Sequence, residues 1–374
     1  MALSARPFVV AARQAGYKVT AIDGFADQQT VAAAEMAIVV NYDHYGFDAE
    51  ALLAAVAKLD ASRYLGFVYG SGFETQPDLL AKIAVFIPLI GNLALTVGAI
   101  NAADSFFSAL ARGNIPYPKV YKKLPGDVDS KVYLRKLVGG CGGTHISFAN
   151  VDSGTSCNQY YYQQFVSGQS VSLLFAANSR AIEVIGFNEQ WLSPTEMLPF
   201  RYGGAVSNVE LSQAVKQQLI TAAEKITVAF GLFGLNSLDA VVNNGLVYVL
   251  EINPRLSASV DLYVADSLYE ANNMALNLIN VHIQASRVEV LLQFKAATVC
   301  KAHAVVYAVS DIVIDSTFSW PAWVLDVPLL ISPQKEFRLL AGEPICTVMA
   351  QAESAEKSKQ LIDARLAEIQ QLLS

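Results

Sequence analysis

The sequence has little charge and no block of basic residues. Only 16% of the 374 residues are Asp, Glu, Lys or Arg, whereas 53% are hydrophobic. That balance excludes a disordered chain and indicates well-packed globular domains. The net charge of −7 argues against a nucleic-acid binder, and the lack of Lys/Arg clusters argues against a polybasic membrane patch. The length is sufficient for two or three domains.

Cysteine and histidine are also scarce, with four of each. They show neither CxxC nor metal-ligand spacing, and no convincing Ser/His/Asp or Cys/His set is present. Free thiols in a cytoplasmic protein are therefore expected. The cysteines are Cys141, Cys157, Cys300 and Cys346.

A long uninterrupted hydrophobic run is missing as well. The most apolar segment, 83–100, contains Pro88, Gly91 and Asn92 and is short for a membrane span. A buried helix, a turn and a buried strand explain it better. The first ten residues lack a basic region followed by a long apolar core, so no signal peptide is expected.

Residues 1–97 alternate between helix-like and strand-like stretches, which predicts βαβ units and a parallel sheet. Such sheets place ligands at the carboxyl ends of their strands. Asp23 and the turn at 71–74, which contains Glu74, stand at two such ends. The usual first strand would be only the short stretch 1–4.

A hairpin is predicted over 235–255, with a turn at Asn243-Asn244-Gly245. Asp239 lies on its first strand and Glu251 near the end of its second strand. Asn253 follows two residues later and so shares a face with Glu251. Two carboxylates and an amide oxygen are hard ligands that suit Mg²⁺. Arg255, two residues further on, could clamp a transferring phosphoryl group.

The segment 134–146 carries four glycines in five residues between two predicted strands. Glycine lets the backbone approach a ligand and point its N–H groups at an anion. No Gly-Lys-Ser/Thr opens a helix there, so the segment is not a P-loop but a β-hairpin flap. Lys136, just upstream, could reach phosphates. The flap glycines and the cysteine between them are Gly139, Gly140, Cys141, Gly142 and Gly143.

A strand end at 163–166, followed by Gly168, could supply the apolar slot and the backbone groups that an adenine needs. Its residues are Gln163, Gln164, Phe165 and Val166. Together these segments resemble the ATP-grasp superfamily: a lysine before a Gly-rich flap, a strand ending in a hinge, then Asp and Glu-x-Asn-Pro-Arg on paired strands. The resemblance covers about residues 1–280, and the Glu-Ile-Asn-Pro-Arg run at 251–255 is its most specific part.

The resemblance implies an α/β N-terminal domain (1–97), a small α+β ATP-grasp lobe with the flap (98–168) and a large lobe with the metal site (169–284). A small β-rich C-terminal domain with a terminal helix (285–374) resembles that of biotin-carboxylase-like proteins. Lys136 and the flap would contact the phosphates of ATP, and Gln163 would face the adenine amino group. Gln164 and Val166 would supply hinge backbone contacts. The metal ligands would hold two Mg²⁺ ions, with Mn²⁺ as an alternative.

Two departures from the family pattern stand out. The second ATP-binding lysine that many members carry at the start of the small lobe is missing from 100–107, and Gln163 replaces an acid. The resemblance implies a carboxylate–amine ligase that forms an acyl phosphate and ADP, with Arg255 and Lys136 in catalytic roles. A bicarbonate-using carboxylase and an inactive ATP-binding module are the alternatives.

Among such proteins, predicted carboligases of methylotrophs are the nearest in pattern, which implies amino-acid or glutamate ligation in tetrahydromethanopterin or methylofuran-type cofactor synthesis. The partners would be a small carboxylate and an amine, with a homodimer as one arrangement. Five residues are candidates for lining the substrate site, although a turn or capping role explains each equally well. They are Glu74, Arg201, Tyr202, Ser257 and Ser259.

Overall fold

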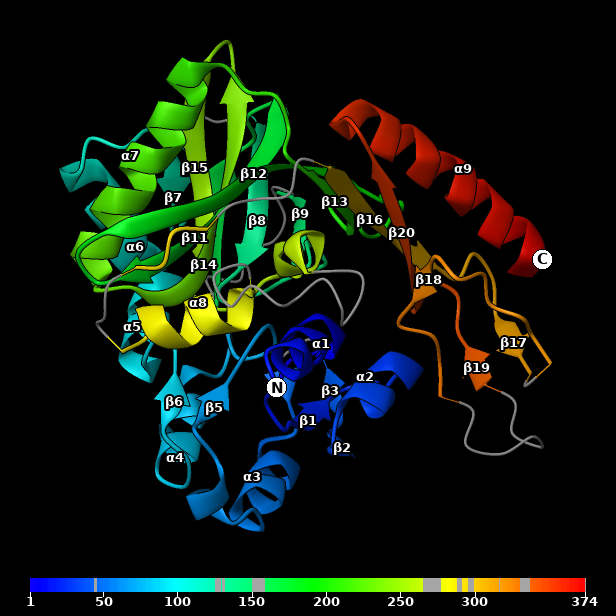
Figure 1. The fold of residues 1–374 in the computed structure, drawn as a ribbon. Coiled ribbons are helices and arrows are strands. Elements are labelled where there is room, and N and C mark those ends of the chain that lie inside the picture. The colour runs from blue at the N-terminus through cyan, green and yellow to red at the C-terminus, as the bar shows by residue number, and fades with distance from the viewer. Residues whose placement is uncertain are drawn as a thin grey trace.

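A computed structural model describes residues 1–43, 46–124, 129, 132–149, 159–264, 277–287, 291–294, 299–315, 317–329 and 337–373. Cys157 lies outside these ranges. The three cysteines within them are free thiols, as predicted. Figure 1 shows the N-terminal part in blue and cyan below a large sheet, with the C-terminal helix on the opposite side from the N-terminal part.

The N-terminal part forms two short parallel strand pairs, which confirms the predicted βαβ pattern, although they do not join into one sheet. The chain start acts as the expected stub strand, since Ala2 bridges Asp23 in parallel and the Met1 carbonyl accepts from Gly70. The elements are α1 (Arg6–Gln14), β1 (Thr20–Asp23), α2 (Gln28–Ala33), β2 (Met36–Val39), β3 (Tyr42–Asp43), β4 (Gly46–Phe47), α3 (Ala49–Ala57), β5 (Phe67–Val68), α4 (Pro77–Ala84), β6 (Leu89–Ile90) and α5 (Ala94–Asn101).

The next segment forms a four-stranded sheet in the order β7-β10-β8-β9. Its strands β8 and β9 are antiparallel and flank the glycines, so the predicted flap is a hairpin. The elements are α6 (Ala103–Arg112), β7 (Val120–Tyr121), β8 (Tyr133–Leu137), β9 (Ile146–Phe148) and β10 (Tyr160–Gln164).

An eight-stranded sheet in the order β15-β14-β11-β12-β13-β16-β20-β18 forms the centre of the molecule (Figure 1). It crosses the predicted boundary at 285, because β13 pairs with β16. The elements are β11 (Gln169–Asn178), β12 (Ile182–Leu192), β13 (Tyr202–Ser207), α7 (Gln213–Phe230), β14 (Phe233–Asn243), β15 (Leu246–Asn253), η3 (Ala258–Tyr263), α8 (Leu278–Ala285), β16 (Cys300–Tyr307), β17 (Ile312–Ile314), β18 (Val324–Leu325), β19 (Phe337–Leu339), β20 (Pro344–Ala352) and α9 (Ala355–Leu373).

Helix α7 shows how the sequence builds one face of this sheet. The Ser212 hydroxyl caps its first turn by accepting from the Val215 amide, and Gly231 ends it in the left-handed conformation with φ of 63°. Leu219 and Ile226 on its inner face are almost fully buried in the cluster that includes β11, β14 and β15. The helix therefore fixes the back of the hairpin that carries the predicted metal ligands.

The apolar segment 83–100 forms the end of α4, then β6 and most of α5, so the predicted helix and strand are present. Among the described residues, no single helix is long and apolar enough to cross a membrane. The pair α5 and α6 passes that test together but bends by 80° between its halves. Ile100, Phe106 and Leu110 of this pair lie in the hydrophobic core.

Candidate active site

The β14–β15 hairpin brings the three predicted metal ligands together. Its turn places Asn244 and Gly245 at positive φ, as a tight hairpin requires. The resulting register sets Asp239 directly opposite Glu251. The Asn253 amide nitrogen donates to an Asp239 carboxylate oxygen at 2.9 Å. The predicted proximity of these three side chains is thus present in the structure.

Lys136 reaches this cluster from the flap strand β8. Its buried ammonium lies 3.5 Å from a Glu251 carboxylate oxygen and donates to the Gln163 side-chain oxygen at 3.3 Å. Burial acts to raise the pKa of Glu251, but the charges of Lys136 and Arg255 outweigh it and hold that pKa below its usual value. The small lobe therefore supplies the positive charge that keeps Glu251 ionised.

Asp239 is in the opposite electrostatic situation. Burial, and then the nearby Glu251 charge, raise the pKa of the Asp239 carboxyl above its usual value. Two partly exposed carboxylates that face each other still repel unless a cation lies between them. This is the charge arrangement that a divalent metal ion relieves.

These residues fit Mg²⁺. Glu251 and Asp239 carry carboxylate oxygens and Asn253 an amide oxygen, all hard donors of the type that Mg²⁺ prefers. In this structure the Asn253 amide oxygen accepts from Arg255, so the side chain would turn to bind the ion. Within the described ranges, no three His, Cys, Asp or Glu side chains gather as a metal site, so the set depends on Asn253 as its third member. Two carboxylate side chains are what Mg²⁺ needs when phosphate oxygens and waters complete its shell.

Arg255 connects the cluster to the N-terminal domain. Its Nε donates to a Glu74 carboxylate oxygen at 2.6 Å, and its terminal nitrogen donates to the Asn253 amide oxygen at 2.7 Å. Both charged side chains are only 8% exposed, so the pair is well shielded from solvent. Glu74, predicted as a substrate residue, is therefore brought to the reacting end of the site, where it holds the guanidinium in place.

A cavity of about 50 Å³ lies between the small lobe and the metal ligands, and Tyr161, Glu251 and Asn253 contribute to its wall. That volume is far below the roughly 300 Å³ of small-molecule pockets, so a nucleotide enters only when the lobes separate. The Gln163 amide nitrogen, whose side-chain oxygen accepts from Lys136, is buried without a hydrogen-bond partner among the described residues. A buried unpaired donor suits a nucleotide acceptor such as an adenine ring nitrogen. The residues therefore fit ATP in an opened form.

Two backbone amides at the hinge that follows β10 are already hydrogen-bonded within the protein. The Gln164 amide donates to the Lys119 carbonyl, and the Phe165 amide donates to the Val132 carbonyl. The Phe165 ring packs on Phe148 of the flap strand and is 42% exposed. Contacts of Gln164 and Val166 with adenine stay a prediction.

The flap is docked on the large lobe. The Tyr202 amide donates to the Gly142 carbonyl at 3.0 Å. A Cβ on Gly143 would lie 1.8 Å from the Phe200 carbonyl oxygen, so only glycine permits this approach. Gly139 is similarly close to the Glu74 backbone. The glycines therefore let the flap close against both neighbours.

Gly143→Ala is expected to hold the flap away from the large lobe and to lower the rate of ADP release at saturating ATP at least tenfold. Gly142→Ala is the matched control, because Gly142 shares the positive φ (66° against 74°), but a Cβ added there would meet no atom within 4 Å. That variant carries only the backbone strain of about 1 kcal/mol. Equal rates in the two variants would show that flap docking is unimportant.

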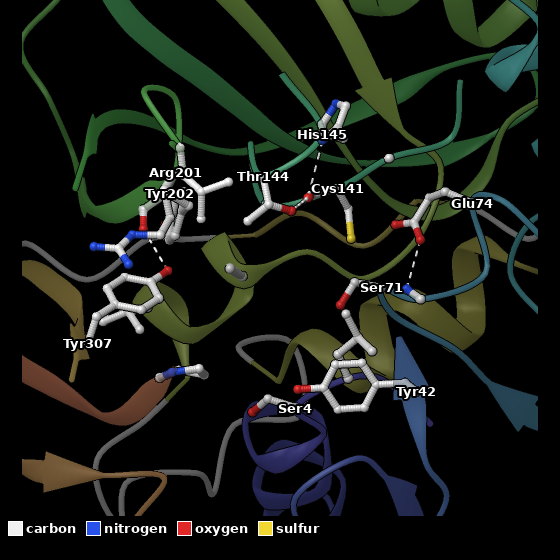
Figure 2. A pocket seen from close by; sticks show the side chains of 18 of the residues that line it. Ser4, Tyr42, Ser71, Glu74, Cys141, Thr144, His145, Arg201, Tyr202 and Tyr307 are labelled. Carbon is white, nitrogen blue, oxygen red and sulfur yellow. Dashed lines mark hydrogen bonds between the residues drawn. The ribbon is translucent and has the colours of Figure 1, made fainter. Parts of the chain in front are cut away.

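A larger cavity of about 910 Å³ opens on the other side of the flap. Figure 2 shows its labelled wall residues: Cys141, Thr144 and His145 come from the flap, and Ser4, Tyr42, Ser71 and Glu74 come from the N-terminal part. Tyr202 and Tyr307 close the opposite side. Glu74 and His145 also line the small cavity, so the two spaces meet at the flap. Burial lowers the pKa of His145 to about 4, which keeps it neutral.

Of the other predicted substrate residues, Tyr202 and Arg201 line the large cavity, whereas the two serines do not. Tyr202 lines the large cavity and shares a 2.7 Å hydrogen bond with the His303 ring. Arg201 also lines it, but its guanidinium donates to Ser193 and Gly342 and stacks 3.7 Å above the Tyr307 ring. It therefore fastens the large lobe to the C-terminal strands.

Ser257 and Ser259 are buried and share a hydrogen bond of 2.8 Å. The side chains that line the large cavity at this point are Leu256 and Ala258 instead. The structure thus turns the serine pair away from the substrate space. Their positions after Arg255 gave no sign of this, because β15 ends at Asn253 and the alternation of faces along a strand no longer applies beyond it.

Sequence reasoning missed a buried charged group on the cavity wall. It comes from five separate segments, so no local pattern reveals it. The only usable signal is the rule that ligands gather beyond strand ends, since one member follows β1. The group, called here the acid cluster, is Arg6, Asp27, Asp261, His303 and Asp326.

Asp27→Asn is expected to stabilise the fold above pH 6. Burial and then the Asp326 charge raise the pKa of Asp27 from 3.8 to about 6. Because the folded-state pKa is the higher one, its stability contribution is complete below pH 4 and is lost as pH rises through 6. The gain should reach about 1–3 kcal/mol at pH 7.5 and fade at pH 4, measured by denaturant unfolding.

Asparagine keeps the helix cap that Asp27 provides to Thr30, so the comparison isolates charge. Asp48→Asn is the matched control, because Asp48 caps α3 in the same way at an exposed position. A gain for Asp27→Asn that does not change with pH would contradict the buried-charge explanation.

The hairpin carboxylates and the Gly-rich flap both lie in a segment that one family model matches. Residues 104–259 match the model of the ATP-grasp domain family, so the chain contains this domain. The architecture is biotin-carboxylase-like. Biotin carboxylase from Campylobacter jejuni superimposes with a TM-score of 0.70 at 14% identity, covering 95% of this chain and 86% of that one. The L-amino acid ligase from Bacillus licheniformis gives 0.68 at 15%, covering 98% and 95%. These likenesses show the fold.

The names of two curated relatives state a particular activity. Tyramine–L-glutamate ligases of Methanocaldococcus fervens and Methanocaldococcus jannaschii are each 27% identical over 183 residues, which is 48% of this chain. The matched segments are 55% and 52% of those proteins. The chain thus spans about half the length of the curated relatives it matches.

Proposed function

We propose that the protein is an ATP-dependent ligase that activates a carboxylate as an acyl phosphate and joins it to an amine, releasing ADP and phosphate. The observation that carries this proposal is the position of the Asp239–Glu251–Asn253 group. Glu251 and Asn253 line the small cavity, and Arg255 bonds to Glu74, which lines both the small and the large cavity. A phosphoryl group held there faces a cavity large enough for two organic substrates.

Bound Mg²⁺ would neutralise phosphate charge, and Asp239, Glu251 and Asn253 would hold it. A substrate carboxylate oxygen attacks the γ-phosphorus, and the bond to the β-phosphate oxygen breaks to release ADP. Arg255, oriented by Glu74 and Asn253, stabilises the charge on the transferring group. We propose two ions, with Mn²⁺ as an alternative.

The second step joins the two substrates. The amine nitrogen attacks the acyl carbon, phosphate leaves, and the nitrogen loses a proton. The docked flap excludes the water that would otherwise hydrolyse the acyl phosphate. Lys136 contacts the phosphates once the nucleotide separates it from Glu251. No protein nucleophile is required.

We also propose that the acid is glutamate or a related amino acid, and that the amine is aromatic, as in tyramine. The names of the curated relatives support this pair. The aromatic rings on the cavity wall, which include those of Phe25, Tyr42 and Tyr160, suit an aromatic amine. A role in tetrahydromethanopterin or methylofuran-type cofactor synthesis, the four domain boundaries, a cytoplasmic location and a homodimer remain proposals of the same kind.

Carboxylate oxygen transfer tests the acyl phosphate. Glutamate labelled with ¹⁸O in both carboxylates is incubated with the protein, ATP, Mg²⁺ and tyramine, and the phosphate is analysed by mass spectrometry. The expected result is one ¹⁸O in each phosphate released. ADP formation with unlabelled phosphate would instead indicate hydrolysis by water and would refute carboxylate activation.

A further inference from the structure

The acid cluster joins three parts of the chain around one guanidinium. Arg6, on α1, donates from both terminal nitrogens to Asp261 at 2.8 and 2.5 Å. Its Nε donates to Asp326 at 2.7 Å. Asp27 lies close enough to Asp326 for that charge to raise its pKa. All of these residues line the large cavity.

The charges in the cluster do not balance. Asp27, Asp261 and Asp326 are three carboxylates, whereas Arg6 is the one guanidinium that bonds with them among the described residues. A second cation, Lys301, donates to the Val264 carbonyl, and its charge helps Arg6 to hold the pKa of Asp261 below its usual value. Three carboxylates against these two cations leave one negative charge in excess. Buried negative charge in excess is unfavourable unless a cation compensates it.

Arg6 pairs with Asp261 and Asp326, and these two ion pairs tie separate parts of the chain together. The third carboxylate, that of Asp27, has no such structural role. Within the part of the chain that the structure describes, the Asp27 carboxylate bonds only to Thr30 of its own helix, and asparagine would cap that helix equally well. A carboxylate at this buried place adds a charge that the fold does not need. Its side of the cavity therefore needs a positive partner.

His303 provides an independent sign of a ligand. The residue is 4% exposed and lines the cavity, and its Nδ1 has no hydrogen-bond partner in the described ranges. That nitrogen lies 3.9 Å from an Asp261 carboxylate oxygen, too far for a hydrogen bond. Burial lowers the pKa of His303, so the ring is neutral and its Nδ1 can accept a hydrogen bond.

The acid cluster continues along the cavity wall to Tyr202, on β13. Tyr202 shares a hydrogen bond with Nε2 of His303. Burial, and then the charge of Asp239, raise the pKa of Tyr202, and Asp261 adds to the effect. Glu74, which bonds to Arg255, lines the same large cavity as the acid cluster, so one substrate in that cavity can face both.

We propose that the acid cluster binds the ammonium group of the amino-acid substrate while a carboxylate of the same molecule reaches the phosphoryl group at Arg255. This inference rests on the proposed ligase function. An ammonium offers three donors, which suits carboxylate oxygens together with a neutral imidazole nitrogen. Asp27 and His303 are the two members with capacity left for it.

Calorimetric titration with L-glutamate and with glutarate, which lacks only the amino group, tests the proposal in the presence of Mg²⁺ and ADP. The wild-type protein should bind glutamate about tenfold more tightly than glutarate, as a charge-assisted hydrogen bond predicts. Asp27→Asn should remove most of that preference by weakening glutamate and leaving glutarate within about twofold. Asp48→Asn, an exposed helix cap, should keep the wild-type preference.

Equal affinity of the wild-type protein for glutamate and glutarate would overturn the inference, as would an unchanged preference in Asp27→Asn. Weakened binding of tyramine in place of glutamate would assign the cluster to the acceptor amine and would also overturn it. Binding is read without turnover. A glutamate preference without any ADP formation from ATP would therefore support the ammonium site and refute the ligase function.

Discussion

Glu251→Gln is expected to lower Mg²⁺-dependent ADP formation by about a thousandfold or more while leaving the fold intact. Glu251 lies opposite Asp239 and supplies the carboxylate that Lys136 keeps ionised. Glutamine has nearly the same shape but carries no charge, so the metal loses its strongest ligand. ADP release with saturating ATP, acid and amine measures the effect.

The melting temperature should change by only about 5 °C, because the loss of the Lys136 contact is offset by relief of repulsion with Asp239. Glu224→Gln, at an exposed position of α7, is the control for a carboxylate removed elsewhere. Full turnover by Glu251→Gln would refute the metal assignment. Loss of turnover together with unfolding would mean that Glu251 is needed for the fold instead.

Arg255→Lys is expected to reduce the turnover rate by about 100-fold to 1,000-fold while changing the KM for ATP by much less. Arginine donates from Nε to Glu74 and from a terminal nitrogen to Asn253, so its planar group is fixed between the domains. Lysine keeps the positive charge but cannot make both bonds. Steady-state rates over a range of ATP concentrations separate the two parameters.

Arg180→Lys, at the exposed turn between β11 and β12, is the matched control and should keep wild-type rates. If the KM for ATP rises in Arg255→Lys by as large a factor as the turnover rate falls, Arg255 has a role in ground-state binding. Arg255→Ala is less informative, because it leaves the buried Glu74 without its cation and should destabilise the fold by about 3–5 kcal/mol.

The sequence was sufficient to predict the β14–β15 hairpin and the Gly-rich flap as structural elements. The Asn-Gly turn fixed the hairpin register that sets Asp239 against Glu251. Lys136 was identified by its position just before the Gly-rich turn. These features are local in sequence, or involve strands joined by one turn, so pattern and spacing determine them.

The substrate side could not be predicted in the same way. Arg201 and Ser257 are polar residues that the sequence suggested for the substrate site. In the structure Arg201 fastens two parts of the chain together, and Ser257 bonds to Ser259. In contrast, Arg6 and Asp326 meet although 320 positions separate them. Such contacts arise from packing between domains, which a single sequence does not encode in any short pattern.

The continuity of the central sheet was likewise hidden. Strand β16 was predicted within a separate C-terminal domain, and it extends the sheet of the large lobe by pairing with β13. This joint brings His303, on β16, beside Tyr202 on β13 and so creates the far wall of the cavity. The C-terminal segment thus contributes to the candidate substrate space as well as to the core.

The most direct test of the ligase function is nucleotide release from Mg²⁺ and ATP across a matrix of carboxylic acids and amines that includes glutamate and tyramine. We expect ADP and phosphate in equal amounts only where an acid and an amine are both present, with a product lighter than their sum by one water. Formation of AMP and pyrophosphate, or no nucleotide turnover in any combination, would contradict an ADP-forming carboxylate–amine ligase.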